Sequence, residues 1–145
     1  MEAVAVAGYS GTPLPKKLGL RDGHVVGFLD LPETLEELKT AALFASVEEL
    51  AVDRIGKDRE KFDLLHLFLT ERERLEDLAA PMGAAIKRDG TIWISWPKKS
   101  SRVPTDITED VIRTVLLPTG LVDVKVCAID AIWSGLKLVI RKELR

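Results

Sequence analysis

Asp63-Leu64-Leu65-His66-Leu67-Phe68-Leu69 is nearly all apolar, and it follows a polar connector at residues 56–61. A strand that is covered on one face alternates apolar and polar residues, whereas a strand that is covered on both faces reads as a continuous apolar run. Strands of the second kind belong mostly to parallel sheets with helices on both sides. This stretch therefore predicts a strand inside a three-layer α/β domain.

Strand and helix patterns alternate on both sides of this stretch. We expect strands at 24–29, at 92–96 and, from a weaker pattern, at 50–55. Helical spacing predicts a helix at about 33–45, a second helix opened by a capping box of Thr70 and Glu73, and a third starting near Asp106 with Glu109 three residues later. Such alternation favours a mostly parallel sheet.

The ends of the chain differ from this pattern. Two strands, at 122–128 and 136–140, flank a short turn around Trp133-Ser134-Gly135, which predicts an antiparallel hairpin. Residues 1–22 are predicted to be a loop and a short helix that packs on the core, with Thr12 as N-cap, Pro13 at the first helical position and Gly19 just beyond the end. The fold class is thus an α/β Rossmann-like sandwich with a C-terminal antiparallel hairpin, in one domain spanning 1–145.

Composition argues against several classes of protein. The chain has 21 Lys and Arg against 23 Asp and Glu, so a nucleic-acid partner is not expected. There is neither a convincing signal peptide nor an apolar run of the roughly 20 residues that span a bilayer, so we expect a soluble, cytoplasmic protein. Cys127 is the only cysteine, and its alternation with apolar neighbours indicates an inert core thiol. No metal or cofactor signature is present.

Cations and hydroxyls follow the strand at 92–96. Lys98, Lys99 and Arg102 alternate with Ser100 and Ser101 just after Trp96-Pro97, and this combination of groups holds carboxylates and phosphates. Ligands of open α/β sheets sit outside the carboxyl ends of such strands. A solvated loop with local ion pairs to Asp106, Glu109 or Asp110 explains the same residues, and the two interpretations stay open.

The order of elements resembles a shortened class I methyltransferase-like Rossmann fold. Asp63-Leu64-Leu65 looks like the start of that fold's fourth strand, and residues 86–93 resemble its turn into the fifth; Asp53 stands where such enzymes hold the cofactor ribose. Those enzymes carry a glycine-rich loop after the first strand, but residues 29–34 here contain no glycine. S-adenosylmethionine is therefore not expected in the usual mode, and no cofactor is assigned.

A closer resemblance is to an uncharacterised family of small bacterial proteins that consist of a domain of unknown function. It rests on Tyr9-Ser10-Gly11-Thr12-Pro13-Leu14, Ser95-Trp96-Pro97-Lys98-Lys99-Ser100, Thr105-Asp106-Ile107-Thr108-Glu109-Asp110 and Trp133-Ser134-Gly135-Leu136-Lys137. The resemblance brings no activity with it, so no catalytic residue is assigned.

Our leading hypothesis is a non-catalytic binding module that recognises a small anionic ligand or a protein partner, including a second copy of the chain. The predicted ligand-binding residues lie at strand ends and in the segment expected to fold across them: Tyr9, Ser10, Thr12, Asp30, Trp96, Lys98, Lys99, Ser100, Asp106 and Glu109. The alternative is an enzyme acting on a phosphorylated or nucleotide-like substrate, with Lys98 or Lys99 stabilising negative charge and Asp30, Asp106 or Glu109 as general base. Nucleic-acid binding through Lys16, Lys17, Lys98, Lys99 and Arg102 is a third class, weakened by the acidic total.

Overall fold

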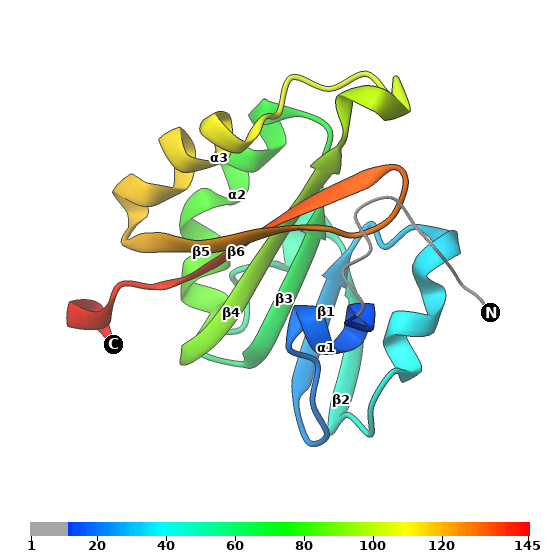
Figure 1. Ribbon diagram of the computed structural model, residues 1–145. Helices are drawn as coiled ribbons and strands as arrows, with labels where there is room; N and C mark the ends of the chain where they lie inside the picture. The colour runs from blue at the N-terminus through cyan, green and yellow to red at the C-terminus, as the bar shows by residue number, and fades with distance from the viewer. Residues whose placement is uncertain (1–11) are drawn as a thin grey trace.

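Six strands form one sheet in the computed structural model, which describes residues 12–145. Their order across the sheet is β2-β1-β3-β4-β6-β5 (Figure 1). The first four pair in parallel, whereas β6 runs antiparallel to both β4 and β5. The prediction of a mostly parallel sheet with a C-terminal antiparallel hairpin is confirmed. The turn of that hairpin lies at 129–132, however, because the expected turn residues Trp133-Ser134-Gly135 are the start of β6 and pair with β5 or β4. The bounds are β1 (Val25–Leu29), β2 (Ser46–Leu50), β3 (Phe62–Phe68), β4 (Ile86–Pro97), β5 (Leu121–Ala128) and β6 (Trp133–Ile140).

Helices cover both faces of the sheet, which gives three layers (Figure 1). α2 and α3 lie on one face, and α1 with the 3-10 helix η1 lies on the other. Shorter 3-10 helices occupy several connections and the C-terminal end. The helical bounds are α1 (Leu14–Leu18), η1 (Glu33–Thr40), η2 (Val52–Arg54), α2 (Arg72–Ala85), η3 (Lys99–Ser101), α3 (Glu109–Leu116), η4 (Leu117–Thr119) and η5 (Lys142–Leu144).

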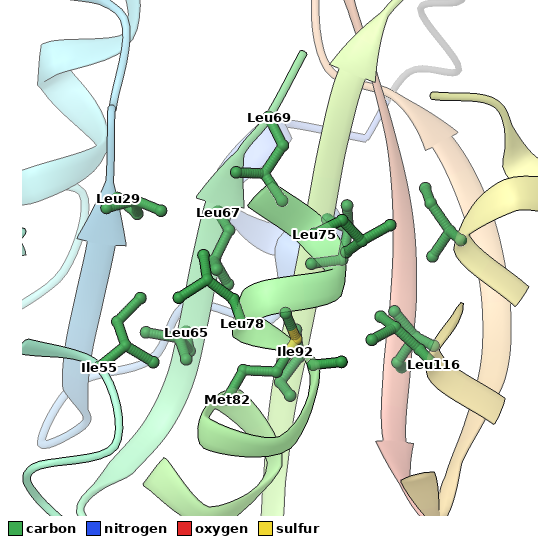
Figure 2. Close-up of a cluster of buried hydrophobic side chains, with 14 of the residues drawn as sticks. Leu29, Ile55, Leu65, Leu67, Leu69, Leu75, Leu78, Met82, Ile92 and Leu116 are labelled. Carbon is green, nitrogen blue, oxygen red and sulfur yellow. The ribbon is translucent and has the colours of Figure 1, made fainter. Parts of the chain in front are cut away.

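β3 separates two hydrophobic clusters, as its continuous apolar run predicts. Leu65 and Leu67 point to the α2 side, where they pack with Leu75 and Leu78 of the helix (Figure 2). Leu64 and Phe68 belong to the cluster under α1 and η1. Fully burying a side chain of this size contributes about 1.5–3 kcal/mol. The strand is therefore a main source of stability. Its carboxyl end lies at the edge of the sheet where ligands of such folds are expected.

The prediction of a strand at 50–55 is wrong. β2 ends at Leu50, and the following residues Val52–Arg54 form η2. β2 lies at the edge of the sheet, where its neighbour β1 supplies its hydrogen-bonding partner. The strand is made by this pairing rather than by the apolar pattern that we used to place it. The expected helix at 33–45 is likewise shorter, ending at Thr40.

Three predicted helix starts are displaced. Pro13, not Thr12, is the N-cap of α1, although Gly19 ends that helix in the left-handed conformation with φ +82° as expected. The capping box of Thr70 and Glu73 is absent, because α2 begins after Glu71 and that residue makes no capping hydrogen bond. The N-cap of α3 is Thr108, whose Oγ1 accepts from the Val111 N–H at 3.1 Å.

No helix in the described range 12–145 is both long and apolar enough to cross a bilayer.

Candidate ligand-binding crevice

The strand order reverses between β1 and β3, because the chain runs from β1 outward to β2 but from β3 outward to β4. In open α/β sheets such a reversal leaves a crevice outside the carboxyl ends of the two strands, and ligands bind there. A cavity of about 290 Å³ lies at this place. Its walls come from the ends of β1 and β3, the first turns of α2 and the start of β6: Asp30, Phe68, Leu69, Thr70, Glu71, Arg74 and Trp133.

An ion pair spans the crevice. Asp30 follows β1 directly and takes a left-handed backbone conformation with φ +55°, which is uncommon for a residue other than glycine. Its Oδ2 accepts from Nη1 of Arg74 in α2 at 3.0 Å. The side chains are 58% and 41% exposed, so the pair contributes little to stability. Separating Asp30 from the guanidinium therefore costs little free energy.

Aromatic rings form the opposite wall. The ring of Phe68 meets that of Trp133 edge-on, with centroids 5.2 Å apart and planes at 90°. Trp133 is held by the β5–β6 turn, in which Oδ1 of Asp130 accepts from the N–H groups of Ile132 and Trp133, each at 2.8 Å. The crevice thus offers one guanidinium, which can bind an anionic group, an aromatic surface, which can pack on a planar group, and two carboxylates.

His66 supports this wall from behind. Its ring is fully buried, stacks on Phe68 at a centroid distance of 4.2 Å, and places Nε2 2.7 Å from Oγ of Ser95 in β4. Burial lowers the pKa of His66 to about 3. His66 is therefore a neutral packing residue, although its Nδ1 has no partner among the described residues.

The predicted site residues divide between the crevice and other places. Asp30 lines the crevice. Trp96 packs on the α2 side of the sheet, only 9% exposed, so it does not line this crevice. Tyr9 and Ser10 lie outside the described residues, and Thr12 is half-buried just before α1.

The cations after β4 are not among the crevice-lining residues. Lys99 and Ser100 lie exposed in η3, and Lys98 is half-buried with its backbone N–H donating to the Ile132 carbonyl at 2.7 Å. In residues 12–145 neither Lys98 nor Lys99 forms an ion pair with Asp106 or Glu109. Glu109 pairs instead with Arg113 in the next turn of α3.

Asp106 caps a helix 34 residues earlier in the chain. Its Oδ1 accepts from the Arg72 N–H, the first of α2, at 2.7 Å, and the Thr105 hydroxyl donates to the Thr70 carbonyl at 2.6 Å. These bonds tie the β4–α3 loop to the mouth of the crevice. Asp106 therefore does not line the crevice itself, but it helps to position the lining residues Thr70, Glu71 and Arg74.

Replacing Asp106 by Ala should lower the free energy of unfolding by about 1 kcal/mol, because the first N–H of α2 loses its partner. Chemical denaturation measures this change. Asp110→Ala is the matched control, since Asp110 is exposed, pairs with Arg113 and is not the N-cap of α3. An equal loss of stability in both variants would contradict the capping role.

Sequence reasoning missed most of the crevice. Arg74, Phe68 and Trp133 line it, but none of them was predicted as a ligand-binding residue, and Trp133 was expected in the hairpin turn. The available signal was the edge of the sheet: α2 follows β3 directly, so its first turns must lie at the carboxyl ends of the strands. Asp53, which the methyltransferase resemblance placed at a cofactor ribose, is exposed in a separate cavity beside Pro81 of α2.

No protein-family model matches this chain, and no curated protein matches it. Solved structures do match. TrmN from Thermus thermophilus aligns over 88% of this chain and 47% of its own, with TM-score 0.61 and 10% identity. A point mutant of MtNAS aligns over 87% and 56%, with TM-score 0.63 and 12% identity. An S-adenosylmethionine-dependent methyltransferase from Aquifex aeolicus aligns over 87% of both chains, with TM-score 0.64 and 17% identity.

The fold is methyltransferase-like. At these identities the likeness concerns the fold alone, and the chain spans about half the length of the first two structures. A fold of this kind can be kept while the site on it changes.

Proposed function

We propose that this chain is a non-catalytic binding domain on a methyltransferase-like fold, and that its crevice between β1 and β3 takes a small anionic ligand. The observation that carries the proposal is the exposed Asp30–Arg74 ion pair across the crevice. Arg74 offers a planar fork of donors that matches a carboxylate or phosphate, and Asp30 holds that fork in place while no ligand is bound. The aromatic wall of Phe68 and Trp133 then favours a ligand that also has a planar or apolar part.

The turn after β1 supports a ligand different from the usual cofactor of this fold. A glycine there would let the backbone approach a bound nucleoside closely. The corresponding residue is Asp30, and Pro32 follows it as the N-cap of η1. A carboxylate side chain thus occupies the position that glycine would leave open.

A non-catalytic role is favoured because the lining residues of the described range include no histidine, cysteine or lysine. The nearest imidazole, His66, is fully buried behind Phe68 and has a pKa of about 3. The only cysteine, Cys127, lies on β5 and is not among the lining residues.

Replacing Arg74 by Met should abolish or weaken anion binding at least about tenfold, because a charge-assisted bond is lost while the volume is kept. Thermal shift followed by calorimetric titration with nucleotides, sugar phosphates and S-adenosylmethionine measures this. Arg88→Met is the matched control, since Arg88 is also an exposed arginine in an ion pair, but its partner Glu60 lies away from the crevice.

Asp30→Asn should change the affinity for an anion in the opposite direction. Removing the carboxylate that competes for Arg74 should tighten anion binding. Unchanged affinity in both the Arg74 and Asp30 variants would refute the crevice as the anion site. Methyl transfer from S-adenosylmethionine to any acceptor, lost in Arg74→Met, would refute the non-catalytic role.

A further inference from the structure

Four cations lie near β5 and β6 on the face of the sheet that α1 covers: Lys17, Arg21, Lys125 and Lys137. Lys125 and Lys137 are directly opposite each other in the antiparallel ladder. Lys137 is also opposite Trp93 of β4, and the indole N–H of Trp93 donates to the Leu18 carbonyl of α1 at 2.9 Å. The side chains of Lys125 and Lys137 therefore lie on the same face of the sheet as α1. Lys17 of α1 reaches the same strands, because its Nζ donates to the Ala128 carbonyl at 3.4 Å. Arg21 follows α1 and, with Lys125, lowers the pKa of Lys137 further than burial alone does.

The arrangement is electrostatically unfavourable without a counter-charge. Like charges directly opposite on neighbouring strands destabilise a sheet. Lys137 is half-buried, and both burial and its cationic neighbours Lys125 and Arg21 disfavour its charged form. We call Lys17, Arg21, Lys125 and Lys137 the cationic cluster.

Within residues 12–145 the carboxylates next to the cluster in sequence are bonded elsewhere, and Asp22, which follows Arg21, accepts from the Leu43 N–H at 2.8 Å. None of its four members forms an ion pair there, and Asp123, the acid closest in sequence to Lys125, is bonded to Arg113 of α3 at 2.8 Å. Residues 1–11 contain one acid, Glu2, which could neutralise at most one of the four charges.

We infer that the cationic cluster binds the phosphate groups of a phosphorylated ligand. Lysine and arginine side chains are the groups that bind phosphate oxygens in proteins, and here Lys17 and Lys137 are half-buried whereas Arg21 and Lys125 are exposed. Two positive charges on one strand pair, with two more from α1 and the residues after it, suit a ligand with more than one phosphate charge. This site is separate from the crevice, because Lys137 stands four residues along β6 from Trp133, about 13 Å away.

Cys127 supplies a reporter at the cluster. It is the only cysteine of the chain, it is half-buried, and Lys17 and Lys125 both act on its thiol, whose pKa burial raises. A phosphate held between those two lysines should cover the thiol. Alkylation of Cys127 by neutral iodoacetamide therefore measures occupancy directly.

The experiment uses the full chain with tripolyphosphate and, separately, a single-stranded oligonucleotide as probes. Each probe that binds should slow alkylation of Cys127, and the Lys125→Gln/Lys137→Gln double variant should bind it at least about tenfold more weakly. Raising the salt should weaken binding to the cluster. Tighter binding of tripolyphosphate identifies a small phosphorylated molecule as the source of the phosphates, and tighter binding of the oligonucleotide identifies a nucleic-acid strand.

The matched control is Lys57→Gln/Lys142→Gln, which removes two exposed lysines elsewhere and should leave binding unchanged. Folding is checked by a second measurement: Lys125→Gln alone should raise the melting temperature in low-salt buffer, because it removes the repulsion across the ladder. Failure of both probes to protect Cys127, or equal protection in the wild type and in the Lys125/Lys137 variant, would overturn the inference. Arg74→Met should not change this binding, so the two sites can fail independently.

Discussion

Lowering the pH from 7 to 5 is expected to reduce the free energy of unfolding by about 2 kcal/mol through His66 alone. The pKa of this buried imidazole is about 3 in the folded chain, against an ordinary value of 6.5. Between these values the unfolded state binds the extra proton and the folded state does not. The contribution of His66 to the free energy of unfolding is therefore complete above pH 6.5, and it is lost progressively as the pH falls toward 3. Urea denaturation at both pH values measures it.

His66→Gln separates this effect from the titration of other groups. Glutamine keeps a polar atom for Ser95 but does not titrate, so the variant should lose about 2 kcal/mol less between pH 7 and 5 than the wild type. The same pH dependence in both proteins would contradict the buried, neutral state of His66. Because Phe68 stacks on His66 and contacts Trp133, we also expect acid to disturb the crevice wall before the rest of the fold.

Local pattern predicted those strands whose own residues carry an apolar run or an apolar alternation. β3 is covered on both faces, so its composition alone identified it. The hairpin followed from two nearby strand patterns, although Gly135, which we expected in the turn, is paired within β6. β2 contains Ser46, Glu48 and Glu49, and it becomes a strand through pairing with β1. The start of α2 depends on Asp106, which is 34 residues away. Long-range partners of this kind leave no periodic signal in the sequence.

The candidate site was predictable as a place more than as a set of residues. Strand-end reasoning pointed to the carboxyl edge of the sheet and to Asp30, which does line the crevice. It favoured Lys98 and Lys99 because cations follow β4, but the cation that faces Asp30 is Arg74. Arg74 reaches Asp30 because of the way α2 packs across the end of β3, which the sequence pattern does not show. The cationic cluster escaped notice for a similar reason, because Lys125 and Lys137 meet only through strand register.

Gly90→Ala is expected to destabilise the chain by about 1–3 kcal/mol, because β4 passes β3 too closely there for a side chain. A Cβ on Gly90 would lie 2.9 Å from the carbonyl oxygens of both Lys87 and Phe62. These are backbone atoms, so relief needs a shift of a strand rather than a rotation of a side chain. The position lies where the pairing of β3 with β4 changes register between Phe62 and Leu64.

Gly83→Ala is the control for Gly90→Ala, since it makes the same chemical change within α2, with nothing within 4 Å of the added Cβ. It should stabilise the chain by about 0.5–1 kcal/mol, because alanine loses less conformational freedom than glycine in a helix. Thermal or urea unfolding of the two variants should thus move in opposite directions from the wild type. If Gly90→Ala were as stable as Gly83→Ala, the strands could not approach so closely at residue 90. The irregular register between β3 and β4 would then need another cause.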